Sequence, residues 1–303
     1  MPAAEYSYEK LRVMSDNFRE PVVVRGFYKD SPALKKWNPD YVSNLLGPYD
    51  VTVMQNSTLG KDHDLNCHKP WTEGMVFSQL ETFEEAMADI KSGTTQKTIV
   101  LPPASRSERN FNTSLQTTFN EMLGDIDLTT LGGAWYRGLA NSALVQFWAG
   151  FGRGENQGTG WHADICNNFI VQVQGTKNWT FVHPRDSKFM RPTMKRGKTA
   201  ISGADVSILE DTLPYLNRKF VTIQPGDMMY NPDFYWHQVK NNPGFTMAVV
   251  ARECNISASF AANPLFTTMI GLNHVRAAVG GGDSYARKRL TSLLPGAMKS
   301  SLM

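Results

Sequence analysis

The sequence has few cysteines, little net charge and no long apolar segment, and each of these scarcities excludes a class of protein. The three cysteines, Cys67, Cys166 and Cys254, are too few and too far apart for a disulfide framework, so we expect free thiols in a reducing compartment. The 31 basic and 28 acidic residues leave a formal charge of +3, so no nucleic-acid partner is expected. No segment approaches the roughly 20 apolar residues of a membrane span.

The amino terminus also lacks the apolar centre of a signal peptide, since its charges are scattered among polar residues. We therefore expect a soluble intracellular protein, cytoplasmic by default, with an organelle as the open alternative. A chain of 303 residues with 41% hydrophobic composition can bury one large core. The expectation is a single domain over residues 1–303.

Three regions are expected within that domain: an N-terminal α/β buttress (1–142), a barrel core with the functional site (143–255) and C-terminal helices (263–299). From residue 143 the chain consists of short apolar or aromatic runs separated by Gly, Pro and Asn, which is typical of a mostly β barrel or sandwich. Core strands are expected near 144–148, 169–173, 178–182, 220–223, 228–231 and 246–252. In the buttress we expect strands at 21–24 and 98–101 and helices near 39–46 and 83–91.

Two further stretches carry less specific signals. Residues 184–219 are polar and too long for a hairpin turn, with a basic group at 188–198, and the alternatives are a lid or a solvated insertion. The tail predicts two helices joined by a glycine break at 280–282. Because residues 265–279 carry more apolar side chains than one packing face needs, a homodimer through these helices is possible.

A candidate metal site begins at His162 and Asp164. These residues are two positions apart, so in an extended chain both side chains point to the same face. His237, which follows a turn signal and a short strand, offers a third ligand. Two histidines and one carboxylate on one face of a metal leave open positions, the arrangement of non-haem iron(II) oxygenases. The alternative is a pair of hydrogen-bonded barrel histidines without a metal.

The residues around this triad resemble the JmjC-like cupin oxygenases, including the asparaginyl hydroxylase branch of that family. The resemblance covers residues 144–252 and is carried by Thr159, His162, Asp164, Asn168, Lys177, the turn at 225–227, Trp236 and His237. The N-terminal half is similar more loosely, through residues 21–27.

The resemblance implies a double-stranded β-helix, the jelly-roll or cupin barrel, that uses iron(II), O2 and the cosubstrate 2-oxoglutarate. By position, Lys177 is similar to the lysine that pairs with the far carboxylate of 2-oxoglutarate, and Thr159 to a hydroxyl that bonds it. Asn168 would support the ligands. Without the resemblance, Lys177 would be interpreted as a solvent-facing hairpin lysine.

Two departures from the family pattern leave questions open. Strand 98–101 offers no phenol where a relative has a tyrosine that contacts the cosubstrate, and Val250 stands where the family has an asparagine. Arg252 shares a strand face with Val250, so it could reach inward as a second cation for the cosubstrate. The alternative is an arginine on the outer rim of the barrel.

Other groups are set aside. His63, Cys67 and His68 lie close together but have no second ligand pair at zinc-finger spacing, so an exposed polar loop is expected. His183 is expected to be structural, and Trp161 and Tyr235 flank the proposed ligands and could line a substrate pocket.

The sequence therefore predicts a 2-oxoglutarate-dependent non-haem iron dioxygenase. It would oxidise a C–H bond of a small molecule or a protein side chain, by hydroxylation or desaturation, and release succinate and CO2. The alternatives are a JmjC histone or protein demethylase and a non-catalytic cupin binding protein. The presence of all three ligands and Lys177 favours an enzyme over a binding protein.

Overall fold

The computed structural model describes most of the chain up to residue 253. The described residues are 1–56, 75–93, 97–101, 113–132, 145–152, 158–164, 166–193, 199–202, 209, 211–253, 260, 263–265 and 267–268. Two antiparallel sheets dominate this part, which confirms the expected mostly β class.

The larger sheet has eight strands. Their order across the sheet is β1 (Val22–Val24), β12 (Met228–Asn231), β7 (Asn167–Gln174), β14 (Gly244–Glu253), β5 (Val145–Gly152), β4 (Lys97–Leu101), β2 (Asp50–Asn56) and β3 (Met75–Thr82). The smaller sheet has six strands, in the order β11 (Arg218–Ile223), β8 (Lys177–Val182), β13 (Trp236–Asn241), β6 (Gly158–Asp164), β10 (Thr199–Ser202) and β9 (Pro192–Thr193). Each strand expected from the apolar runs is present.

The two faces of the larger sheet have different environments, and β7 shows this most clearly. Phe169 and Val171 point away from the barrel into the large core shared with the helices. Ile170 points the other way and packs with Trp179 and Phe181 of β8, across the space between the sheets. Alternation along each strand thus separates an outer, helix-covered face from a barrel lumen.

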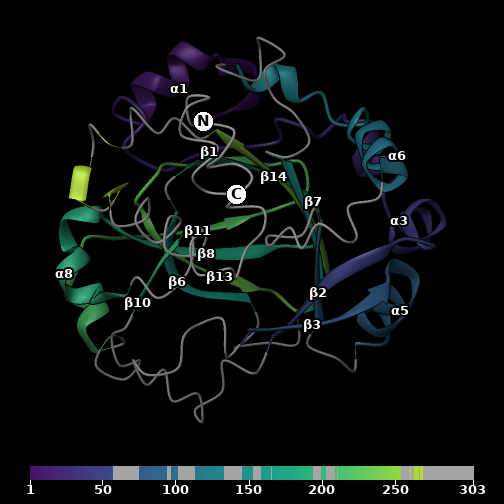
Figure 1. Cartoon of the computed structure of the whole chain (residues 1–303). Helices are drawn as coiled ribbons and strands as arrows, with labels where there is room; N and C mark the ends of the chain where they lie inside the picture. Colours follow the sequence, from purple (N-terminus) through teal and green to yellow (C-terminus); the bar gives the residue numbers. More distant parts are fainter. Residues whose placement is uncertain are drawn as a thin grey trace, which may run out of the picture.

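Helices cover the outer face of the larger sheet, and Figure 1 shows α3, α5 and α6 along one side of the barrel with α8 on the other. The α-helices are α1 (Tyr8–Met14), α2 (Pro32–Lys36), α3 (Pro39–Leu46), α5 (Phe83–Ser92), α6 (Thr113–Leu123) and α8 (Ser187–Met190). The 3₁₀ turns are η1 (Ala3–Glu5), η2 (Leu128–Leu131), η4 (Pro184–Asp186) and η5 (Leu213–Tyr215). None of the helices in the described ranges is long and apolar enough to cross a membrane.

Local signals in the sequence explain where α5 begins and ends. Thr82 and Glu85 form a reciprocal capping box at its start, and Gly93 closes it in a left-handed conformation that only glycine adopts at little cost. Phe83, Met87 and Ile90 recur at helical spacing and are fully buried in the large core.

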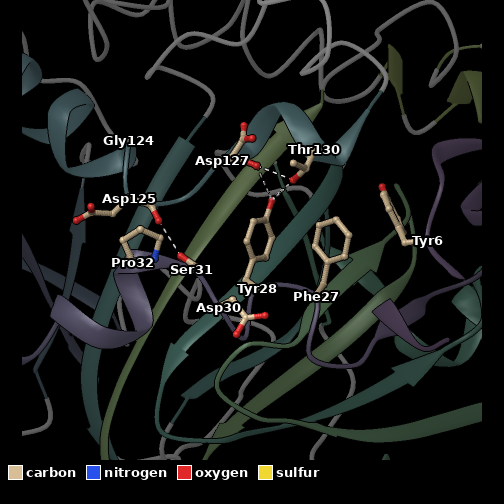
Figure 2. Close-up of a pocket in the computed structure, with 10 residues that line it drawn as sticks. All are labelled: Tyr6, Phe27, Tyr28, Asp30, Ser31, Pro32, Gly124, Asp125, Asp127 and Thr130. Atoms are coloured by element: carbon tan, nitrogen blue, oxygen red, sulfur yellow. Dashed lines mark hydrogen bonds between the residues drawn. The ribbon is translucent and has the colours of Figure 1, made fainter. Parts of the chain in front are cut away.

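A cavity of about 460 Å³ lies between the segment before α2 and residues 124–130 (Figure 2). The Tyr28 hydroxyl donates to the Asp127 carbonyl oxygen at 3.1 Å, and the Ser31 hydroxyl donates to that of Asp125 at 2.7 Å. The Asp125 carboxylate accepts hydrogen bonds from Lys36 and Trp37. These hydrogen bonds therefore hold the N-terminal segment against the loop after α6.

Several expectations change or fall outside the described residues. Cys166 is disulfide-bonded, so the expectation of three free thiols is wrong. The stretch 184–219 is not one long loop: its described parts form α8, β9, β10 and η5, and Met190 and Leu216 pack against Trp236. The cluster at His63, Cys67 and His68, the loop 194–198 and nearly all of the C-terminal helices lie outside the described residues.

Candidate metal centre

His162, Asp164 and His237 meet inside the barrel. One ligand atom of each lies within 4.8 Å of the others. His162 and His237 are direct cross-strand partners on β6 and β13, and Asp164 follows His162 by one alternation of β6. All three are buried: His162 is 8% exposed, Asp164 5% and His237 2%. The two-residue spacing on β6 thus places both of its polar groups on one inward face, as the sequence predicts.

Backbone carbonyls fix the orientation of both imidazoles. Nδ1 of His162 lies 2.7 Å from the Gly160 carbonyl oxygen, and Nδ1 of His237 lies 2.9 Å from that of Tyr235. A carbonyl oxygen only accepts, so Nδ1 carries the proton in each ring and Nε2 is the unprotonated nitrogen. Burial lowers the pKa of His162, and burial together with the neighbouring His162 lowers the pKa of His237 to about 3. Both rings are therefore neutral, the form that coordinates a metal.

Asp164 links the two sheets. Its Oδ2 accepts a hydrogen bond from Asn168 Nδ2 of β7 at 3.0 Å and one from Arg252 Nη1 of β14 at 3.2 Å. Burial alone would raise the pKa of Asp164, but the Arg252 guanidinium and the hydrogen bond from Asn168 hold it well below its usual range. Arg252 also donates through Nε to Gln146 Oε1 at 3.0 Å. The carboxylate is thus ionised and held from two sides.

Arg252 is consequently an inward residue, not an arginine of the outer rim. Its side chain is 26% exposed, and it is the direct register partner of Asn168 on β7. The sequence indicated its face but gave no sign of its partners, because Asp164 and Gln146 lie 88 and 106 positions away in the chain.

A register shift between β6 and β13 brings Thr159 to the lumen. Thr159 precedes His162 by three positions, so regular alternation along β6 would point the two side chains to opposite faces of the strand. The pairing changes between His237 and Val239, so that Thr159 stands opposite Val239, an inward residue. A β-bulge of this kind re-aims side chains and cannot be read from the sequence pattern.

Lys177 begins β8 on the same face as Trp179 and Phe181, which pack in the lumen. Its register partners are Asn241 and Ile223. Burial lowers the pKa of the Lys177 ammonium to about 8. Within the described residues no carboxylate pairs with it. Lys177 is therefore a partly buried lysine that faces the lumen, and not a solvated hairpin lysine.

Unpaired polar atoms in the described part of the chain are concentrated in the lumen. They belong to Trp148, Thr159, Asn168, Gln172, Gln174, Trp179, Asn231 and Asn241. Register and alternation place each of these residues on the inward face of its strand. A buried polar group without a partner costs about 1–3 kcal/mol, so the lumen suits a polar occupant.

Four aromatic or histidine positions differ in role. Trp161 packs against the outer cluster under α8, on the face opposite His162, so the expectation that it could line the substrate pocket is wrong. Tyr235 is fully buried, and its hydroxyl donates to Glu20. His183 lies 3.7 Å from Glu20, outside the metal cluster, which agrees with a structural role. Trp179 was not singled out by the sequence, yet its ring stacks on His237 at 5.5 Å.

A barrel of two antiparallel sheets with two inward histidines and one inward carboxylate is the architecture of the JmjC-like cupins. The chain belongs to this family: the family model described as Cupin-like domain matches residues 15–251. The sequence is also similar to JmjC domain-containing protein E of Dictyostelium discoideum, at 22% identity over 296 residues, which span 84% of this chain and 80% of that protein.

Two other relatives match over shorter segments. The bifunctional lysine-specific demethylase and histidyl-hydroxylase NO66 of Aedes aegypti is 29% identical over 104 residues, 33% of this chain and 15% of that protein. The tRNA wybutosine-synthesizing protein 5 of Mus musculus is 28% identical over 80 residues, 26% of this chain and 25% of that protein. The chain thus spans a quarter or less of these two relatives.

Proposed function

We propose that this protein is an iron(II)- and 2-oxoglutarate-dependent dioxygenase that oxidises a C–H bond by hydroxylation or desaturation, releasing succinate and CO2. The observation that carries the proposal is the inward cluster of His162, Asp164 and His237, with donor atoms within 4.8 Å of one another. Lys177, a cation with no carboxylate partner among the described residues, lies on the same side of the smaller sheet.

The donor set fits iron(II). Two neutral imidazoles with Nδ1 bonded to carbonyl oxygens offer their Nε2 lone pairs, and Asp164 adds an ionised carboxylate. Iron bound there would supply the oxygen chemistry, while the protein fixes which hydrogen of the substrate meets the oxidant.

Lys177 and Thr159 fit the cosubstrate. Lys177 stands four positions along β8 from Phe181, the register partner of His237, which is about 13 Å along a strand. A lysine side chain and a five-carbon dicarboxylate together span such a gap. The Lys177 ammonium would then pair with the far carboxylate, and the unpaired Thr159 hydroxyl would donate to it.

The remaining residues would keep the site rigid and dry. Asn168 and Arg252 would hold Oδ2 of Asp164, so that the carboxylate keeps one orientation toward the metal. Trp179 stacks on His237, and Phe181 packs beside it, which restricts water around the ligand. Arg252 remains a candidate for contact with the cosubstrate, although in this structure its guanidinium is bonded to Asp164 and Gln146.

Two kinds of substrate fit the proposal, one supported by the names of relatives and the other by the site itself. Relatives named as a histidyl-hydroxylase and a lysine-specific demethylase support a protein side chain, and demethylation is the runner-up reaction. A small-molecule substrate is equally compatible with the site, because the same lumen would serve either.

The test is turnover of purified protein with iron(II), 2-oxoglutarate and O2, with succinate measured and an extract of the producing cells analysed by untargeted mass spectrometry. We expect succinate together with a product that gains one oxygen or loses two hydrogens. Formaldehyde release would identify a demethylase instead. Binding of metal and 2-oxoglutarate without any turnover would identify a non-catalytic binding protein and contradict the proposal.

We further propose a homodimer formed through the C-terminal region. Phe260 and Leu265, described residues of this region, are exposed apolar side chains at 52% and 72%. Light scattering at micromolar concentration tests the proposal, and a monomer would contradict it.

A further inference from the structure

Arg252 occupies a place where a fixed positive charge affects any metal bound nearby. Its Nη1 lies 3.2 Å from Oδ2 of Asp164, and its Nε bonds Gln146, so the guanidinium is held from both ends. Asn168 bonds the same Oδ2 at 3.0 Å. Asp164 would therefore keep its hydrogen bond from Asn168 if the Arg252 charge were removed.

Among the described residues, the charges around the cluster do not favour binding of a divalent ion without an anionic ligand. Asp164 contributes one negative charge, and Arg252 already neutralises it as an ion pair. Lys177 adds a second positive charge on the lumen face, and the two histidines add none. A divalent ion bound to Asp164 would lie close to the guanidinium in a buried site, where repulsion between like charges is weakly screened.

A dianionic ligand would offset the positive charges around the cluster and so favour binding of the divalent ion. A 2-oxo dicarboxylate brings two negative charges, one near the metal and one toward Lys177. Binding of the ion and of the dianion would then favour each other, and by linkage the coupling is the same in both directions.

We propose that Arg252 makes metal binding at the His162–Asp164–His237 cluster depend on the dicarboxylate cosubstrate, by holding Asp164 and placing a positive charge beside the ion. This inference rests on the proposed function. It assigns Arg252 a positioning and charge-balancing role that is distinct from a direct contact with the cosubstrate. The site would load its metal fully only when 2-oxoglutarate is present.

The experiment is calorimetric titration of Mn²⁺, a redox-stable substitute for iron(II), into the metal-free full chain with and without 2-oxoglutarate. For the wild type we expect the dicarboxylate to tighten Mn²⁺ binding by about tenfold or more. For Arg252→Gln we expect Mn²⁺ alone to bind about tenfold more tightly than to the wild type, because Asn168 still orients Asp164. The effect of the dicarboxylate should then fall below about threefold.

Two controls separate charge from structure. Arg252→Lys keeps the charge and should keep most of the effect of 2-oxoglutarate on Mn²⁺ affinity. Arg218→Gln removes an exposed charge on β11 and should leave the Mn²⁺ affinity unchanged, both with and without 2-oxoglutarate. Circular dichroism melting establishes that each variant is folded. If Arg252→Gln binds Mn²⁺ no more tightly than the wild type and retains the coupling, the inference is wrong while the proposed function stands. If the wild type binds no Mn²⁺ even with 2-oxoglutarate, the proposed function itself fails.

Discussion

His162 on β6 and His237 on β13 face each other directly across the smaller sheet, with ring centroids 4.1 Å apart. They are 75 positions apart in the sequence, yet the antiparallel register makes them neighbours on one inward face. Carbonyl oxygens of Gly160 and Tyr235 turn both rings so that Nδ1 is the protonated nitrogen. The pair is therefore oriented before any metal arrives.

Replacing either histidine by alanine should abolish turnover with much less effect on folding. Losing a residue that merely supports a ligand costs about 10–100-fold, and losing the ligand itself should cost at least as much. Succinate formation and metal content by elemental analysis measure the effect, and His183→Ala, which alters a histidine outside the cluster, is the matched control. Substantial succinate production by His162→Ala with iron(II) present would show that the ligand assignment is wrong.

Lys177→Ala should raise the KM for 2-oxoglutarate. A charge-assisted bond is worth about 1.5–3 kcal/mol, which corresponds to about tenfold or more in affinity. Lys240→Ala, which removes an exposed lysine from β13, should leave the KM unchanged. An unchanged KM in Lys177→Ala would show that another cation contacts the cosubstrate. The double variant with Arg252→Ala would then decide whether that cation is Arg252.

The affinity for 2-oxoglutarate should depend on pH through Lys177. Burial lowers the pKa of its ammonium to about 8 in the cosubstrate-free protein, so the charged form that binds the dianion is fully present below that pH. As pH rises through about 8, the KM should climb, by about tenfold for each further pH unit. Initial rates from pH 6.5 to about 9.5 measure this. Lys177→Arg should remove the dependence, because a guanidinium stays charged, and a flat wild-type profile would contradict the assignment.

We expect Asp164 to determine the type of product. Its carboxylate would occupy a coordination position that chloride needs in halide-transferring relatives of these enzymes, so we expect hydroxylated or desaturated product and no chlorinated product even at high chloride. Asp164→Gly should lose native oxidation. It should also lower the melting temperature, because it leaves the Arg252 guanidinium without its carboxylate, a change that costs about 3–5 kcal/mol for a buried pair. A halogenated product from the unmodified protein would show that Asp164 is not a ligand.

Much of the fold and of the candidate site could be predicted from short-range patterns. The apolar runs identified the barrel strands, and the two-residue spacing of His162 and Asp164 fixed their common face. The capping signals of α5 are equally local. These features follow from helix and strand periodicity, which the sequence displays directly.

Other features depend on which strands become neighbours. The outer position of Trp161 follows from packing under α8, and the inward position of Thr159 follows from a register shift between β6 and β13. The disulfide of Cys166 was likewise not predicted, because cysteine count and spacing do not reveal proximity in space.

By itself, the sequence determined the mostly β class, the resemblance to the JmjC-like cupins and the three residues that form the inward cluster. Only the tertiary structure decided that Arg252 pairs with Asp164, that Lys177 is a partly buried cation without a carboxylate partner in the described chain, and that the unpaired polar atoms gather in the lumen. The physical reason is that strand periodicity specifies the face of each side chain, whereas its partner on that face is set by the pairing of strands far apart in the chain.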